Sequence, residues 1–181
     1  MILGIGGWAR AGKDTIADHL VANYGFTKLS FADPMREALL KLNPSINVGG
    51  NYVSLSQAVS ISGWENLKHL SDDVRPLMQR LGTEVGRNMF GQNIWVDLAM
   101  KEAKKYDRVV FADCRFQNEA NAIKDNGGFN WRVTRPGFEA ANDHISEHDL
   151  DEYKFDIYLT NAHSTDLLYD AVDALIGNVI G

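Results

Sequence analysis

The chain has 181 residues, 45% of them hydrophobic and 23% charged, and this composition is typical of one folded domain with a buried core. It excludes disordered, collagenous and coiled-coil proteins. Since the apolar runs are too short to cross a bilayer and no basic segment precedes them, we expect neither a membrane span nor an export signal. The formal charge of −6, from 18 Lys and Arg against 24 Asp and Glu, argues against polymeric nucleic acid as a partner.

The single cysteine, Cys114, cannot form an internal disulfide, and it also excludes cysteine-based zinc sites. We therefore expect a cytoplasmic protein. The sequence leaves the oligomeric state open, with a homodimer as the base-rate expectation. A small anionic ligand is compatible with the acidic composition, because a few arginines converging on one pocket can hold phosphate groups.

Short apolar segments alternate with longer segments of helical period along the whole chain. Their alternation predicts a three-layer α/β domain around a mostly parallel five-stranded sheet, with strands covered on both faces. The expected strands are 2–6, 27–31, 108–113, 130–134 and 156–160. Helices are expected over 13–23, 33–42, 74–85, 118–124 and 164–176, and around Trp95.

Three local signals refine these elements. Gly25 predicts the end of the first helix, and Asp33, followed by Pro34, predicts an N-cap for the second. Residues 43–73 interrupt the alternation, and a capping-box pattern at Ser54-x-x-Gln57 leads us to expect a loop followed by short helices. We therefore predict a single domain over 1–181 with an insertion at 43–73 that binds substrate or acts as a lid.

The segment that follows the first strand carries the strongest motif. Gly7 to Lys13 fits the phosphate-loop pattern Gly-x-x-x-x-Gly-Lys. The glycines let successive backbone N–H groups face an anion, the helix start adds its positive end, and Lys13 can reach the outer phosphates of a nucleotide. A match between a strand and an amphipathic helix arises by chance in roughly one of several hundred chains. The sequence therefore predicts a triphosphate site rather than a glycine-rich turn with a surface lysine.

Asp14 departs from the motif, which normally has Ser or Thr at this position to hold Mg²⁺. A carboxylate is also a hard oxygen ligand, so Asp14 is the candidate metal ligand, directly or through water. Thr15 still offers a hydroxyl group to the phosphates. Because Asp14 would repel phosphate in the absence of metal, we expect strict metal dependence.

A second candidate group, Asp113 and Arg115, follows a buried strand, where ligands gather in open α/β sheets. Asp113 can orient the metal shell or the acceptor, and Arg115 can hold a phosphate with two hydrogen bonds. A surface ion pair is the alternative interpretation. A phosphate acceptor needs no histidine base, because its second pKa of about 6 leaves it ionised near neutral pH. Further cations near this edge of the sheet are Arg10, Arg36, Arg75, Arg80 and Arg135.

Over nearly its full length the chain resembles the phage-type deoxynucleoside monophosphate kinases, within the phosphate-loop nucleoside monophosphate kinases. The matching stretches are Gly12-Lys13-Asp14-Thr15, Phe31-Ala32-Asp33-Pro34 with Arg36, Leu77-Met78-Gln79 with Leu81-Gly82-Thr83, Trp95-Val96, Asp113 with Arg115 and Glu119, Arg135-Pro136-Gly137, Asn142-Asp143-His144, and Thr160-Asn161. An aspartate after the motif lysine is itself a feature of that family. The expected location becomes the host cytoplasm if the source is viral.

The resemblance implies transfer of the γ-phosphoryl group of ATP, with Mg²⁺, to a deoxynucleoside monophosphate, giving the diphosphate for DNA synthesis. It implies catalytic roles for Lys13, Asp14 and Arg115, with Asp14 at the metal. The residues that it places around ATP are Arg10, Gly12, Lys13, Asp14 and Thr15, with Arg135 and Asn161 near the adenine. Those that it places around the monophosphate are Met35, Arg36, Gly82, Thr83, Trp95, Asp113, Arg115 and Glu119.

One position departs from the family. The relatives carry paired arginines before Leu-Met-Gln, whereas Pro76 follows Arg75 here. Arg80 lies one helical turn beyond Pro76, and we hypothesise that it supplies the missing cation to the substrate. Trp95 fits base stacking and core packing equally well.

Two further features of the sequence, and the function itself, each have more than one interpretation. Trp8 lies within the loop and covers either the site or a partner surface, and His144 and His148 fit a hydrogen-bonded loop better than a metal cluster. The alternatives to the nucleotide kinase are another phosphate-loop small-molecule kinase, such as one acting on dephospho-coenzyme A, or a nucleotide-binding switch protein. Base selectivity and preference for deoxyribose do not follow from the residues.

Overall fold

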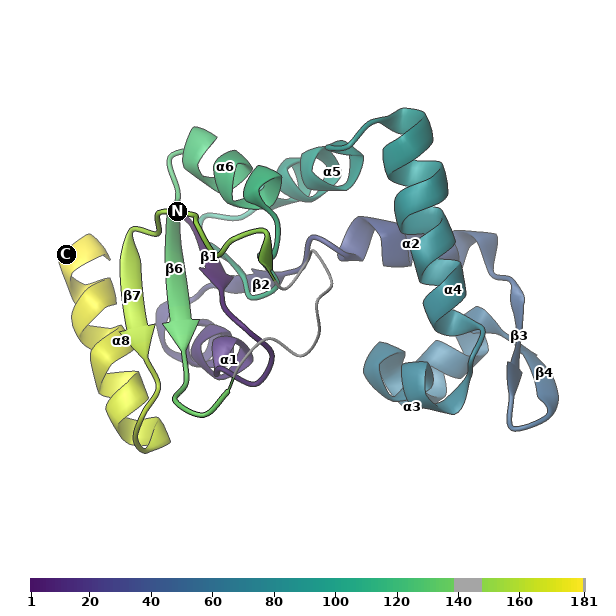
Figure 1. Cartoon of the computed structure of the whole chain (residues 1–181), viewed down its shortest axis with the longest axis horizontal. Coiled ribbons are helices and arrows are strands. Elements are labelled where there is room, and N and C mark those ends of the chain that lie inside the picture. Colours follow the sequence, from purple (N-terminus) through teal and green to yellow (C-terminus); the bar gives the residue numbers. More distant parts are fainter. Residues whose placement is uncertain (139–147, 181) are drawn as a thin grey trace. The chain divides into compact units, whose positions relative to one another are not determined.

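A computed structural model describes residues 1–138 and 148–180 of the chain (Figure 1). The chain divides into two compact units. Met1–Phe31 and Met100–Gly181 form the first, which we call the sheet unit, and Ala32–Ala99 form the second, which we call the helical unit. The helical unit extends beyond the predicted insertion at 43–73 on both sides.

The sheet unit contains a five-stranded sheet in the order β2-β5-β1-β6-β7, and each pair of neighbouring strands is parallel. This confirms the predicted fold class. The strands are β1 (Ile2–Gly6), β2 (Thr27–Leu29), β5 (Val109–Phe111), β6 (Phe129–Thr134) and β7 (Ile157–Thr160). All five coincide with predicted strands, and β2 and β5 are shorter than predicted.

Helices cover both faces of this sheet. The helices described in this unit include α1 (Lys13–Tyr24), α6 (Gln117–Asp125) and α8 (Thr165–Ile180), with the last residues of α5 (Ile94–Ala103). Leu3 and Ile5 of β1 are fully buried in the cluster that α1 and α8 share. Gly4 lies between them on the opposite face, where an added Cβ would come within 2.4 Å of Ile123 on α6. Successive residues of β1 therefore face helices on opposite sides of the sheet, so that the sheet forms the middle of three layers.

Of the two predicted helix boundaries, the end of α1 is confirmed and the start of the next helix is wrong by one residue. Gly25 ends α1 in the left-handed conformation, with φ 68°, as predicted. The cap of α2 (Asp33–Leu42) is Ala32, so the prediction of Asp33 as N-cap is wrong by one residue. The carbonyl of Ala32 already accepts the first helical hydrogen bond, from Arg36 N–H at 3.0 Å. Asp33 therefore lies in the first turn, where its charge favours the helix dipole.

The helical unit corrects the loop predicted after α2. Its elements are α2, β3 (Ser45–Val48), β4 (Asn51–Ser54), α3 (Leu55–Leu70), α4 (Val74–Gln79), the π-helix η1 (Arg80–Phe90) and the first residues of α5. β3 and β4 pair antiparallel through Gly49 and Gly50, whose positive φ values suit a two-residue turn. Ser54 caps α3 by accepting from Gln57 N–H at 3.4 Å, as predicted.

The predicted short helices form instead as α3, which bends at Gly63 (φ 69°), and the predicted helix over 74–85 divides into α4 and η1. A separate core, which includes Leu39, Leu55, Leu67 and Val74, holds the unit together. Within the described residues, every helix is too short or too polar to span a membrane.

Candidate active site

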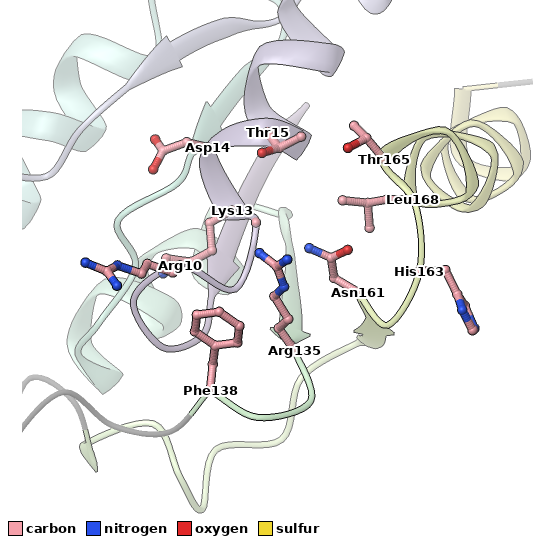
Figure 2. A pocket seen from close by; sticks show the side chains of 11 residues that line it. Arg10, Lys13, Asp14, Thr15, Arg135, Phe138, Asn161, His163, Thr165 and Leu168 are labelled. Carbon is pink, nitrogen blue, oxygen red and sulfur yellow. The ribbon is translucent and has the colours of Figure 1, made fainter.

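A cavity of about 470 Å³ opens in the sheet unit, at the carboxyl ends of β1, β6 and β7 (Figure 2). The phosphate loop follows β1, and the other two strands bring Arg135 and Asn161 to the same edge. Its lining residues are Arg10, Gly12, Lys13, Asp14, Thr15, Arg135, Phe138, Asn161, His163, Thr165 and Leu168. The structure thus brings together all the residues assigned to ATP from the sequence, which come from three separate segments.

Two glycines shape the loop. Gly7 has a φ of +141°, and an added Cβ would lie 2.2 Å from the carbonyl oxygen of Val133. Gly12 has a φ of +108°, and a Cβ there would lie 2.7 Å from Nδ2 of Asn161. Both the left-handed backbone and the close approach exclude larger residues. The motif glycines therefore fix how the loop lies against β6 and against the residue that follows β7.

Side chains hold this loop from two sides. Lys13 is buried, and its ammonium donates hydrogen bonds of 2.7 Å to the carbonyl oxygens of both Gly7 and Trp8. Asn161 donates from Nδ2 to the carbonyl oxygen of Ala11 at 3.0 Å. In Figure 2, Lys13, Arg135 and Asn161 reach the same cavity from three different elements. The loop is therefore held in place by contacts within the chain itself.

Arg135 forms a second feature of the cavity. Its guanidinium carbon lies 4.8 Å from the ring centre of Phe138, which is a cation–π distance. Phe138 and three other lining residues, His163, Thr165 and Leu168, were not identified from the sequence. Only their position, shortly after β6 and β7, marks them as candidates.

Asp14 lies in the wall of the same cavity with an exposed side chain. Its carboxylate forms an ion pair of 2.9 Å with Lys28, which also contacts Asp18 at 2.9 Å. Burial alone would lower the pKa of Lys28, but the hydrogen bonds to Asp14 and Asp18 outweigh it and raise the pKa. The Asp14 carboxylate and the Thr15 hydroxyl are the hard oxygen donors that fit Mg²⁺, which takes its other ligands from water and phosphate.

The second candidate group of the sheet unit lies at the end of β5. Asp113 accepts hydrogen bonds from the hydroxyl of Ser30 at 2.5 Å and from Phe31 N–H at 3.2 Å. Glu119 is buried, and its Oε2 accepts from the backbone N–H groups of Arg115 (2.7 Å) and Phe116 (3.0 Å). Glu119 therefore caps α6 and fixes the backbone that carries the exposed Arg115.

The helical unit brings three other predicted residues together. Trp95 donates from its indole N–H to the carbonyl oxygen of Gly82 at 2.8 Å. A Cβ on Gly82 would lie 2.9 Å from the sulfur of Met35, and one on Gly86 would lie 2.4 Å from the Trp95 ring. Trp95 is half-buried and packs against η1, and Thr83 is exposed on the same helix. The close approaches of Met35 to Gly82 and of Trp95 to Gly86 explain why η1 carries glycine at these two positions.

The two predicted cations of this unit have different partners. Arg36 on α2 pairs with Asp33 at 3.4 Å and with Glu65 on α3 at 3.2 Å. Arg80 on η1 is exposed and forms a long ion pair, 3.9 Å, with Glu84. The residues assigned to the monophosphate thus divide between the units. Met35, Arg36, Arg80, Gly82, Thr83 and Trp95 belong to the helical unit, and Asp113, Arg115 and Glu119 to the sheet unit.

Other residues singled out from the sequence have structural partners. The ring of Trp8 packs against the guanidinium of Arg132, whose central carbon lies 5.6 Å from the ring centre. His148 forms a hydrogen bond of 2.9 Å with Asp151, as the hydrogen-bonded alternative predicts. His144, with the matching stretch Asn142-Asp143-His144, lies outside the described residues.

A glycine-rich loop between β1 and α1, with its lysine and a cation-lined cavity at the carboxyl edge of a parallel sheet, defines a phosphate-loop kinase. The family model for deoxynucleotide monophosphate kinase matches residues 49–172. The chain therefore belongs to the deoxynucleotide monophosphate kinase family.

Two relatives in sequence agree with this assignment. A protein of Acanthamoeba polyphaga mimivirus is 30% identical over 200 aligned residues, which cover 98% of this chain and 97% of the relative. The deoxynucleotide monophosphate kinase of Enterobacteria phage T4 is 27% identical over 164 residues, covering 83% of this chain and 68% of its own. Among solved structures, shikimate kinase from Aquifex aeolicus matches with a TM-score of 0.49 and 15% identity, covering 100% of this chain and 99% of that one.

Proposed function

We propose that this chain transfers the γ-phosphoryl group of ATP to a deoxynucleoside monophosphate, producing the diphosphate and ADP. The observation that carries the proposal is the cavity of about 470 Å³, which gathers a phosphate loop with Arg135 and Asn161 in a member of this kinase family. The proposal assigns ATP to this cavity.

The donor side of the proposal follows from the loop. The N–H groups of the loop and the Lys13 ammonium bind the β- and γ-phosphates, and Arg10 adds a second positive charge at the cavity wall. Arg135 and Phe138 offer flat surfaces to the adenine, and Asn161 adds an amide beside it. Asp14 and Thr15 would hold Mg²⁺, which when bound neutralises charge on the phosphates.

The acceptor side needs cations rather than a general base. An oxygen of the acceptor phosphate forms a bond to the γ-phosphorus, while the bond from that phosphorus to the bridging oxygen breaks and its electron pair leaves with ADP. The acceptor oxygen is already ionised near neutral pH, so no proton has to be removed. Arg36 of the helical unit binds the acceptor phosphate, and in the sheet unit Glu119 fixes the backbone that carries Arg115.

The test is to incubate the purified protein with ATP, Mg²⁺ and each deoxynucleoside and ribonucleoside monophosphate in turn, and to quantify the diphosphates. Formation of deoxynucleoside diphosphate supports the proposal and reveals base and sugar preference. Transfer to dephospho-coenzyme A instead would identify a different small-molecule kinase. Release of phosphate to water without transfer would identify a switch protein.

We also place the reaction in the cytoplasm, because the single thiol, Cys114, is buried and gives no reason for an oxidising compartment. Burial raises the pKa of Cys114 well above its usual value, so the thiol is unreactive. The homodimer stays a base-rate expectation, and sedimentation measurements on the purified protein would test it.

A further inference from the structure

One exposed carboxylate in the helical unit is shared by two cations. Glu65 on α3 accepts from Arg36 on α2 at 3.2 Å and from Lys68 at 2.7 Å. The side chain of Glu65 is 74% exposed, whereas those of Arg36 and Lys68 are only 23% and 18% exposed. The two positive side chains are therefore held within the protein surface, and the carboxylate that they bind lies on the solvent side.

The sequence fixes both cations through neighbouring core residues. Gly63 bends α3, and the helix that resumes after it buries Leu67 completely. Lys68, the next residue, is largely covered, whereas Glu65 is exposed. Arg36 lies one turn before Leu39 on α2, and Leu39 belongs to the same hydrophobic cluster as Leu67. The backbone positions that carry the two cations are therefore anchored in one core.

Arg36 has a second, more distant carboxylate partner, Asp33. Two cations face Glu65, and the additional carboxylate of Asp33 contacts Arg36 only at 3.4 Å. Within the described part of the chain, Nε of Arg36 is buried without a hydrogen-bond partner, so the guanidinium has donor capacity that its present partners do not use. Exposed ion pairs contribute little to stability, so an anion with more charge can displace Glu65 readily.

We propose that Lys68 and Arg36 together bind the phosphate of the acceptor nucleotide, and that Glu65 occupies the position of this phosphate in the free protein. The proposal rests on the proposed function and names a further residue for its acceptor. A phosphate monoester brings two negative charges and three oxygens, and thus satisfies both cations better than one carboxylate does.

Lys68 also accounts for the departure from the family pattern, where Pro76 follows Arg75. Arg80, the residue first considered as the replacement cation, has a side chain that is 72% exposed and lies nearest to Glu84. Lys68, by contrast, forms an ion pair with Glu65, the same carboxylate that Arg36 contacts. The structure therefore favours Lys68 over Arg80 as the second acceptor cation.

The experiment measures steady-state kinetics with either substrate varied, together with calorimetric binding of the monophosphate alone. Lys68→Met should raise KM and Kd for the monophosphate roughly tenfold, with the KM for ATP nearly unchanged. Lys68→Arg should restore most of the affinity. Glu65→Gln should lower Kd for the monophosphate by about two- to fivefold, because it removes the competing charge. Loss of a purely structural ion pair would not improve binding.

Glu37→Gln is the matched control, since Glu37 forms an exposed ion pair with Lys41 on the same helix as Arg36. It should change neither constant, and circular dichroism checks the fold of each variant. An unchanged Kd in Lys68→Met, or weaker binding in Glu65→Gln, overturns the inference while leaving an active wild-type kinase. If the wild type phosphorylates no deoxynucleoside monophosphate, the proposed function itself fails and this inference with it.

Discussion

The phosphate loop and the cation cluster of Arg36, Glu65 and Lys68 prepare for phosphate in different ways. In the loop, left-handed glycines and hydrogen bonds to carbonyl oxygens fix the backbone, and the phosphate-binding groups are mostly N–H groups of that backbone. In the cluster, the groups are side chains on two helices, and a carboxylate of the chain itself occupies the place between them.

The difference has a physical consequence. The groups of a backbone site are already ordered, so little conformational entropy is lost when phosphate binds. A substitution that changes the path of the backbone, however, abolishes phosphate binding. In a site made of side chains, the substitution of a single charged residue can raise or lower the affinity for phosphate. We therefore expect large, one-directional effects in the loop and graded effects in the helical unit.

The largest effect is expected for Lys13→Ala. The Lys13 ammonium lies within the loop and faces the nucleotide cavity, so its loss removes charge stabilisation of the migrating phosphoryl group. We expect kcat to fall about 1,000-fold or more, with the fold nearly intact by circular dichroism. Lys41→Ala, which removes an exposed lysine of α2, serves as the control. Turnover within a few-fold of wild type would remove Lys13 from its assigned role.

Gly12→Ala tests the backbone of the loop. Its φ of +108° and the 2.7 Å approach of Asn161 make a side chain costly, by about 1–2 kcal/mol for the conformation alone. We expect the Kd for ATP to rise roughly tenfold, measured by calorimetry. Gly25→Ala is the matched control, since Gly25 also has a positive φ but lies at the end of α1 with nothing close to its Cβ. It should lower the melting temperature without weakening ATP binding.

Trp95→Phe tests the helical unit with a smaller change. A smaller aromatic ring replaces the indole, and the hydrogen bond to the Gly82 carbonyl, worth about 1 kcal/mol, is lost. We expect the KM for the monophosphate to rise about fivefold and the KM for ATP to stay constant. Trp64→Phe alters another tryptophan that packs on the core of this unit, and should affect only stability. Equal changes in both KM values for Trp95→Phe would show that Trp95 does not act on the acceptor.

The sequence was most informative where one segment carries the whole signal. The five strands are short apolar runs, and the phosphate loop lies between a strand and a helix, so the sheet and the ATP residues could be predicted. The hairpin of β3 and β4 was missed because each strand has only four residues, and its Gly49-Gly50 turn also fits a loop.

Contacts between distant segments gave no such signal. Glu65 and Lys68 look like an ordinary surface pair on a helix, and only the fold brings Arg36, 29 residues before Glu65, to the same carboxylate. Phe138 and His163 carry no motif and enter the cavity only because β6 and β7 end at its edge. Functional groups that lie within one segment can be identified from the sequence. Contacts that join distant segments, such as the ion pair between Arg36 and Glu65, can be identified only from the tertiary structure.

The smallest effect concerns the packing of α1, the helix that begins at the phosphate loop, against α8. The side chain of Asp173 on α8 accepts from His19 of α1 at 2.5 Å. Its pKa is lowered mainly by this hydrogen bond, and next by the one from Tyr24. A carboxyl group whose pKa is lowered by folding stabilises the protein above its unfolded pKa of about 3.9, and this contribution is lost as pH falls through the folded value.

We therefore expect wild type to lose more thermal stability than Asp173→Asn when the pH is lowered from 7 to 3, and the difference between the two to shrink as the pH falls. Asp170→Asn changes an exposed aspartate of the same helix and should follow the wild-type curve. Parallel melting curves for wild type and Asp173→Asn over this range would show that the contact between α1 and α8 carries no charge-dependent stability. The position of α1, and with it that of the phosphate loop, would then depend on apolar packing between α1 and α8, through residues such as Ile16 and Val172.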